Sequence, residues 1–258
     1  MKTARLYPKN AFTLIELLAV VGIIAILAAL LLPSTSQAKS KSQSTACKNH
    51  LLQIGRAMSM YAADHNRYPP LLCGEIGDSF AIWADRLEPY EQINWTNEQW
   101  NCPAYISCNG IVKFKKPLFN HDTGIIDLSY SYNCFGIAGH KFYPALGFGY
   151  EDLWTINEAE IIAPSQMYVV ADARAYQYGN SSGPAGEPEM DPWLHHFKDP
   201  EVSPPHSDAY NLLFADEHVE PVKRRDYLFP PRTAQHWNRD NRQHLEAWAP
   251  TNKWVVSN

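Results

Sequence analysis

The feature that most constrains this chain is an apolar run over residues 12–32, which holds a single ionisable side chain, Glu16. Its twenty-one residues, at about 1.5 Å each in a helix, span roughly 31 Å, which is the thickness of a bilayer's hydrocarbon core. A short basic stretch, MKTARLYPKNA, precedes the run. Because positive charges stay on the cytoplasmic side, we expect a single membrane crossing with the N-terminus in the cytoplasm and the body extracytoplasmic.

Three interpretations of this apolar run differ in whether they explain Glu16. A plain membrane anchor leaves the carboxylate unexplained, because an unpaired charge at that depth costs several kcal/mol. A secretory signal peptide with a cleavage site at residues 36–38 leaves it unexplained too, and the run is long for such a peptide. Cleavage between Ala11 and Phe12 instead puts the new α-ammonium of Phe12 one helical turn from Glu16. In a helical array, Glu16 of one subunit could pair with Phe12 of its neighbour, which would favour assembly in one register.

Residues 11–18, AFTLIELL, closely resemble the type III signal of type IV prepilins and type II secretion pseudopilins. The resemblance implies that a prepilin peptidase cuts before Phe12 in the inner membrane and methylates its amine. It also implies that Glu16 guides assembly with other pilin or pseudopilin subunits, and that Pro33 matches a family proline that kinks or loosens the helix. The chain departs from the family before the cut, where Gly is usual and Ala11 stands here.

Residues 34–66 are predicted to continue as an amphipathic helix. Apolar side chains recur at spacings of 4, 3, 4 and 3, which places them on one helical face: Cys47, Leu51, Ile54, Met58 and Tyr61. The prolines at 69–70 end the helix, since Pro disfavours helix at its own position and just before it. The resemblance implies that this face packs on an antiparallel sheet, so the expected fold class is α+β and pilin-like, with a loop-rich insert.

Most of the 19 prolines and 13 glycines follow residue 65, which favours a loop-rich body over a helical bundle. Within the insert at residues 71–165, we expect residues 100–103 and 129–133 to be local turn elements. The expected organisation is a leader peptide (1–11), a transmembrane and assembly helix (12–33), an amphipathic helix (34–66) and an extracytoplasmic β-rich body (67–258).

The clearest strand is residues 167–171, and a predicted hairpin follows over residues 210–215 and 218–222. Asp216 and Glu217 separate the two halves of the hairpin. A tight primed turn needs positive φ at both central residues, and Glu is unfavourable there. The sequence therefore predicts either another turn type or a longer loop.

His206 precedes Asp216 by ten positions, within HSDAYNLLFADEHV. This resembles a His-x9-Asp-Gly element near the end of many prepilin-like proteins, with Glu217 in place of the Gly. We expect His206 and Asp216 to hydrogen-bond across the hairpin and fix its register. Two alternatives stay open: a divalent metal held by His206, Asp216 and His218, which are suitable ligand types, or a catalytic role. No other cofactor is expected.

The five cysteines include no C-x-x-C pair, which argues against a zinc ribbon or a thioredoxin-type redox site. If the body lies outside the cytoplasm, one or two disulfides are plausible and one thiol stays odd. Cys102 is expected to be a buried thiol or half of a disulfide rather than a nucleophile, since no His or acid lies at an activating spacing.

The formal net charge is −5, and loss of the leader with its three basic residues leaves −8, with no basic stripe for nucleic acid. The chain has no G-x-S-x-G, H-E-x-x-H or P-loop motif, so no enzymatic activity is expected. The predicted function is a structural subunit of a type IV pilus or a type II secretion pseudopilus. The alternative is a membrane-tethered module that does not polymerise and whose aromatic-rich body binds a glycan or surface component.

Overall fold

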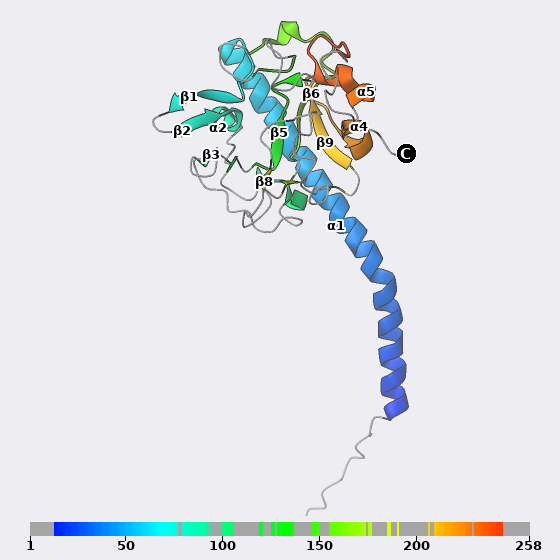
Figure 1. Cartoon of the computed structure of the whole chain (residues 1–258). Coiled ribbons are helices and arrows are strands. Elements are labelled where there is room, and N and C mark those ends of the chain that lie inside the picture. The colour runs from blue at the N-terminus through cyan, green and yellow to red at the C-terminus, as the bar shows by residue number, and fades with distance from the viewer. Residues whose placement is uncertain are drawn as a thin grey trace, which may run out of the picture. The chain divides into compact units, whose positions relative to one another are not determined.

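The computed structural model describes a long N-terminal helix and the core of the body (Figure 1). The chain forms two compact units, Met1–Ser42 and Gln43–Asn258. The described residues are 13–76, 79–91, 93, 100–105, 119–120, 125–126, 128–136, 146–149, 155–173, 175–176, 185–186, 190, 206, 209–228 and 230–244.

Helix α1 spans Leu14–His65 and stays helical through Pro33. Pro33 has no backbone N–H to donate to the preceding turn. The hydroxyls of Ser34 and Thr35 donate to carbonyls three residues earlier, at 2.8 and 2.9 Å. The helix ends where the two following prolines predict, and Asn66 takes a left-handed φ of 56° just past its last residue.

A four-stranded antiparallel sheet, in the order β10-β9-β6-β5, forms the centre of the body. Its strands are β5 Tyr130–Tyr132, β6 Tyr168–Asp172, β9 Ala209–Phe214 and β10 Val219–Lys223. In register, Ala171 of β6 lies opposite Ser131 on one side and Leu212 on the other. The long helix and this sheet confirm the predicted α+β class and are consistent with a pilin fold.

The other described elements are short. They are β1 Leu72–Ile76, β2 Ser79–Ile82, α2 Trp83–Leu87, β3 Phe119–Asn120, β4 Ile125–Ile126, η4 Glu158–Glu160, β7 Ala175–Tyr176, β8 Ala185–Gly186, α4 Arg224–Leu228, α5 Pro230–Thr233 and η5 Ala234–Trp237.

The predicted apolar stripe of α1 is buried in the body. All five of its members are at most 6% exposed. Gly55 lets the helix approach β9 closely, because a Cβ at this position would lie 2.9 Å from Leu213 Cδ1. Burying one large apolar side chain contributes about 1.5–3 kcal/mol. The stripe is therefore a major source of the body's stability, and its predicted packing on the sheet is confirmed.

Both faces of the sheet are covered. Successive residues of a strand point to opposite faces. Accordingly, Leu213 belongs to the hydrophobic cluster that contains the α1 stripe, whereas Leu212 belongs to a second cluster with Tyr227 and Trp237. Tyr227 belongs to α4 and Trp237 to η5, both of which follow β10, and α4 lies beside β9 (Figure 1).

The expected turn element at residues 129–133 is instead an edge of the main sheet. Its tyrosines favour a strand, and pairing with β6 provides the ladder that sequence alone does not reveal. Asn133, which follows the strand, is fully buried. Its Nδ2 donates to the carbonyls of Tyr168 and Trp237 at 2.8 and 3.0 Å, and its Oδ1 accepts from Gly136 N at 3.0 Å. This residue therefore ties the sheet to the C-terminal segment.

The predicted hairpin forms β9 and β10, within a residue at each end, and residues 215–218 join the strands. Glu217 N donates to Phe214 O at 3.0 Å, and Phe214 N donates to His218 O at 2.9 Å. Glu217 takes a φ of 68°, as in a type I turn followed by a left-handed bulge residue. The longer loop is thus confirmed. Ser59 of α1 donates to Glu217 Oε1 at 2.6 Å and links the turn to the helix.

We expect substitutions at Ser59 and Glu217 to be coupled. Glu217→Gly relieves the left-handed conformation but removes the bond to Ser59, and no such bond is lost in a Ser59→Ala background. The change in the free energy of unfolding caused by Glu217→Gly should therefore be more stabilising in the Ser59→Ala background than in the unmodified chain, by about 0.5–1.5 kcal/mol. Chemical unfolding of the full chain in detergent measures this difference. Equal effects in both backgrounds would show that the bond does not stabilise the hairpin.

Candidate functional site

A reciprocal capping box closes the N-terminus of α1. Thr13 donates to Glu16 Oε2 from its backbone N–H at 2.9 Å and from its hydroxyl at 2.7 Å. Glu16 N donates back to Thr13 Oγ1 at 3.3 Å. These bonds satisfy N–H groups that have no partner within a helix. Ala11 and Phe12, the predicted processing residues, lie outside the described residues.

The first half of α1 has an apolar surface on all sides. Its large hydrophobic side chains are exposed by 46% to 81%, and the described residues contain only two others that are comparably exposed, Met60 and Ile162. By length and composition the helix can cross a membrane. An apolar surface all round a helix requires lipid or other apolar helices to cover it. The exposed residues are Leu14, Ile15, Leu17, Leu18, Val20, Val21, Ile23, Ile24, Ile26, Leu27, Leu30, Leu31 and Leu32.

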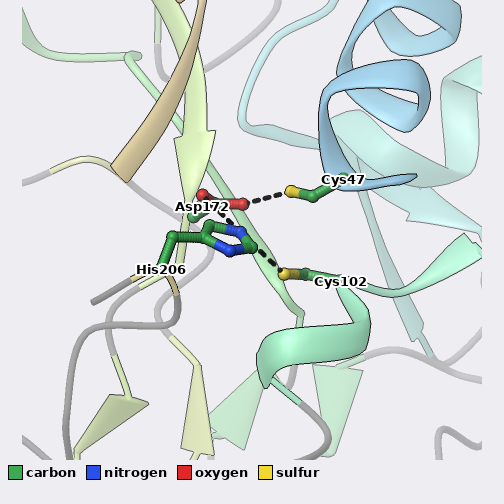
Figure 2. Close-up of side chains that lie close together, drawn as sticks. All are labelled: Cys47, Cys102, Asp172 and His206. Carbon is green, nitrogen blue, oxygen red and sulfur yellow. Dashed lines mark hydrogen bonds and ion pairs between the residues drawn. The ribbon is translucent and has the colours of Figure 1, made fainter. Parts of the chain in front are cut away.

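Four ionisable side chains meet inside the body in a group that we call the thiol cluster: Cys47, Cys102, Asp172 and His206 (Figure 2). Cys47 belongs to α1, Cys102 precedes a helical turn at residues 103–105, Asp172 ends β6, and His206 forms a bridge with the first residue of β9. His206 is 7% exposed and the other three have no exposed surface. The fold thus gathers four distant segments around one buried point.

The contacts within the thiol cluster are short. Cys47 Sγ donates to Asp172 Oδ1 at 2.5 Å, and Cys102 Sγ lies 3.3 Å from His206 Nε2. The same Nε2 lies 3.2 Å from Asp172 Oδ2. One candidate ligand atom from each residue lies within 4.8 Å of all the others. These residue types at these separations can hold a metal ion.

Burial and mutual contacts shift the protonation of the thiol cluster. Burial raises the pKa of the Cys47 thiol, and the neighbouring Cys102 and Asp172 raise it further. Burial opposes ionisation of Cys102 as well, but hydrogen bonds from Cys47 and His206 lower the pKa of this thiol overall. Burial disfavours the charged imidazole, yet the contacts with Asp172 and Cys102 raise the pKa of His206 to about 10. Without a metal, Cys47 therefore keeps its proton and His206 is a cation.

The thiol cluster lacks the geometry of a nucleophilic triad. In such a triad one imidazole nitrogen faces the nucleophile and the other faces the acid. Here Nε2 of His206 faces both Cys102 and Asp172. Nδ1 is buried and has no hydrogen-bond partner among the described residues. Cys102 also has no exposed surface through which a substrate could approach it.

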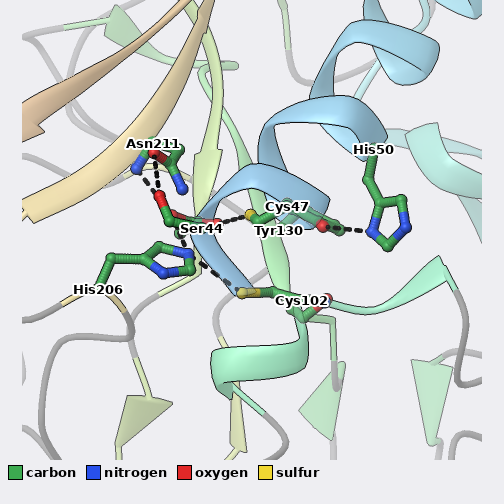
Figure 3. A network of polar contacts seen from close by, with 9 residues as sticks. Ser44, Cys47, His50, Cys102, Tyr130, His206 and Asn211 are labelled. Carbon is green, nitrogen blue, oxygen red and sulfur yellow. Dashed lines mark hydrogen bonds and ion pairs between the residues drawn. The ribbon is translucent and has the colours of Figure 1, made fainter. Parts of the chain in front are cut away.

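A wider polar network surrounds the thiol cluster (Figure 3). Asn211 N donates to Asp172 Oδ2 at 2.7 Å, and Asn211 Oδ1 accepts from Ser44 Oγ at 3.3 Å. On the other side, Tyr130 OH lies 3.1 Å from His50 Nδ1. These contacts join α1 to β5 and β9 and hold the carboxylate of Asp172 in place.

The structure does not bring His206 and Asp216 together as the sequence suggested. His206 contacts Asp172 and Cys102, while Asp216 Oδ1 lies 2.5 Å from Nδ1 of its turn neighbour His218. The reason is that His206 precedes β9 and Asp216 follows it. At about 3.3 Å per residue, a six-residue strand separates its two ends by roughly 17–20 Å.

Of the expected disulfides, none involves Cys47, Cys102 or Cys134, which are buried and reduced. Cys102 is thus a buried thiol, one of its two expected states. The side chain of Cys73 and the whole of Cys108 lie outside the described residues. Sequence reasoning did not connect Cys47 or Asp172 to a site, because Cys47 was part of the apolar stripe and Asp172 directly follows the predicted strand at 167–171.

Comparison with known proteins identifies the N-terminal segment. The model of the prokaryotic N-terminal methylation motif matches residues 8–32. This match includes the capping box and the exposed apolar part of α1. No solved structure matches the chain.

Similar proteins include a secretion-system component and two pilus proteins. The type II secretion system core protein G of Aeromonas hydrophila is 34% identical over 61 residues, covering 24% of this chain and 43% of that protein. The type IV wide pilus major component of Thermus thermophilus is 44% identical over 59 residues, covering 23% and 45%. The type IV major pilin of Myxococcus xanthus is 36% identical over 78 residues, covering 30% and 35%.

The chain spans less than half the length of each of these relatives, which are named as structural components and not as enzymes. It therefore carries a prepilin-type N-terminal methylation motif and is similar, over less than a third of its own length, to type IV pilins and type II secretion core proteins.

Proposed function

We propose that this protein is a prepilin-like structural subunit of a type IV pilus or a type II secretion pseudopilus, without a reaction of its own. A prepilin peptidase cleaves it between Ala11 and Phe12 and methylates the new N-terminus. The observation that carries the proposal is the position of Glu16, the one acid in the apolar segment, in the first turn of a helix whose first half is apolar on all sides.

The carboxylate of Glu16 is stabilised among apolar helices only if a cation pairs with it. Cleavage before Phe12 creates an α-ammonium next to Thr13, whose N–H and hydroxyl already hold the carboxylate at the helix terminus. In an assembly, Glu16 pairs with Phe12 of a neighbouring subunit, and burial of this pair among apolar helices selects one register. Before assembly, the exposed apolar side chains contact inner-membrane lipid. In the assembly, they pack on other subunits instead.

The proposed topology follows from charge. Lys2, Arg5 and Lys9 keep the leader (1–11) in the cytoplasm, and the segment over residues 12–33 crosses the inner membrane. The amphipathic helix (34–66) and the body (67–258) are then extracytoplasmic, with Pro33 at the junction. The partners are the prepilin peptidase, other pilin or pseudopilin subunits and lipid. The net charge of the mature chain gives no basis for a nucleic-acid partner.

Two substitutions separate the charge of Glu16 from its capping role. Glu16→Gln removes the charge but preserves the capping box, because Glu and Gln both serve at this position. Thr13→Ala removes the cap, at about 0.5–2 kcal/mol, and keeps the charge. We expect both variants to be cleaved. We expect Glu16→Gln to be largely lost from filaments and Thr13→Ala to assemble almost as well as the unmodified chain.

The readout is the fraction of the chain in sheared filaments or, for a pseudopilus, cross-linked to other subunits in the membrane. Loss of residues 1–11, followed by mass, shows that the peptidase has acted. Normal assembly of Glu16→Gln would contradict the proposed charge pair. A cleaved, unmodified chain that never cross-links to another subunit would instead favour a tethered binding module.

A further inference from the structure

We propose that Cys47, Cys102, Asp172 and His206 form a structural zinc site that locks α1 to the sheet of the body. The site lies wholly within the unit Gln43–Asn258. It does not depend on the proposed function, because it concerns residues outside the methylation motif at 8–32.

The geometry of the thiol cluster is close to that of a tetrahedral site. Zinc bonds of about 2.0–2.3 Å place ligand atoms about 3.3–3.8 Å from one another. The separations of His206 Nε2 from Cys102 Sγ and Asp172 Oδ2 are 3.3 and 3.2 Å. The 2.5 Å contact between Cys47 Sγ and Asp172 Oδ1 would open by about 1 Å, within reach of side-chain rotation. Each residue already points into the shared centre (Figure 2).

The charges of the thiol cluster also favour a cation. Fully deprotonated, Cys47, Cys102 and Asp172 would place three negative charges in a site with almost no exposed surface. Burying such charges is costly unless they are paired or bind a metal. Without a metal, one N–H of His206 is shared between Cys102 and Asp172, and Cys47 must keep its proton. Zinc replaces this shared arrangement with four direct bonds and releases the protons to solvent.

The ligand types select the metal. Calcium and magnesium take oxygen ligands, so two sulfurs and an imidazole exclude them. Thiolate, imidazole and carboxylate are all ligands that Zn²⁺ accepts, and a closed arrangement of four protein ligands is typical of structural Zn²⁺ sites. Asn211 N, which donates to Asp172 Oδ2 at 2.7 Å, orients the carboxylate ligand as outer-shell groups do in zinc sites.

A disulfide between Cys47 and Cys102 fits the contacts less well. A disulfide sulfur has no proton, so Asp172 Oδ1 would lose the donor that now lies 2.5 Å away. Asp172 Oδ2 would retain His206 and Asn211 N as its partners. Asp172 Oδ1 would remain in contact with a sulfur that has no proton to donate. Zinc bonds both sulfurs and one carboxylate oxygen, and Asn211 N continues to donate to Asp172 Oδ2.

Zinc would join four segments that are distant in sequence. Cys47 starts the buried stripe of α1, Asp172 ends the central strand β6, and His206 precedes β9. Cys102 belongs to the segment between α2 and β3. A metal bound to all four ties the helix to the sheet at one end of its contact, where the apolar stripe begins.

The test is the zinc content of the full chain, purified in detergent without chelators or metal-affinity resin and measured by inductively coupled plasma mass spectrometry. We expect about one zinc per chain. Cys102→Ser and His206→Gln should lower zinc to background. Cys134→Ala, at a buried cysteine outside the thiol cluster, and His218→Gln, at the histidine of the hairpin turn, are matched controls that should retain it.

Cobalt substitution keeps the test valid if the ligand variants fail to fold. After the zinc is exchanged for Co²⁺, the unmodified chain should show the visible bands of tetrahedral Co²⁺ and a thiolate charge-transfer band, both lost when Zn²⁺ is added back. Zinc content no higher than that of Cys102→Ser, a cobalt spectrum without the thiolate band, or a Cys47–Cys102 disulfide in peptide maps would each overturn the proposal.

Discussion

The body of this protein depends on the contact between the apolar stripe of α1 and the sheet. Ile54 and Met58 are buried in the same cluster as Leu213 of β9, and Gly55 allows the close approach of helix and strand. Ser59 continues this contact to the hairpin turn through Glu217. Cys47, at the other end of the stripe, reaches the thiol cluster. One helical face therefore organises both the core and the polar sites of the body.

Much of this architecture was predictable because it follows local periodicity. The 3–4 spacing of apolar residues predicted the stripe, and two strand-like runs on either side of Asp216 and Glu217 predicted the β9–β10 hairpin. The strand β5 was missed, since Tyr130 and Tyr132 lie in a short segment rich in turn residues and become a strand only by pairing with β6. Local pattern does not report such non-local pairing.

The thiol cluster could not be found from spacing. Consecutive members of the cluster lie 34 to 70 positions apart along the chain, and none forms a motif with another. The resemblance that drew attention to His206 paired it with Asp216, which lies beyond the far end of β9. Only the fold, which brings α1 beside the end of β6, shows that the acid near His206 is Asp172. The predicted contact between His206 and Asp216 was therefore wrong.

The N-terminal helix and the body differ in their similarity to known proteins. The methylation motif and the similar proteins concern a short part of the chain. The body is interpreted from its own contacts, including the buried Asn133 that joins β6 to the C-terminal segment. In the proposed function, the N-terminal helix mediates assembly, while the body is held together by its own hydrogen bonds.

The most direct test of the central claim is mass spectrometry of the N-terminus after extraction from the membrane. We expect a chain that begins at N-methylated Phe12 and lacks residues 1–11. A chain with an intact Met1 would indicate a plain membrane anchor, and a start near residue 39 would indicate a secretory signal peptide. Either result would contradict the proposed processing.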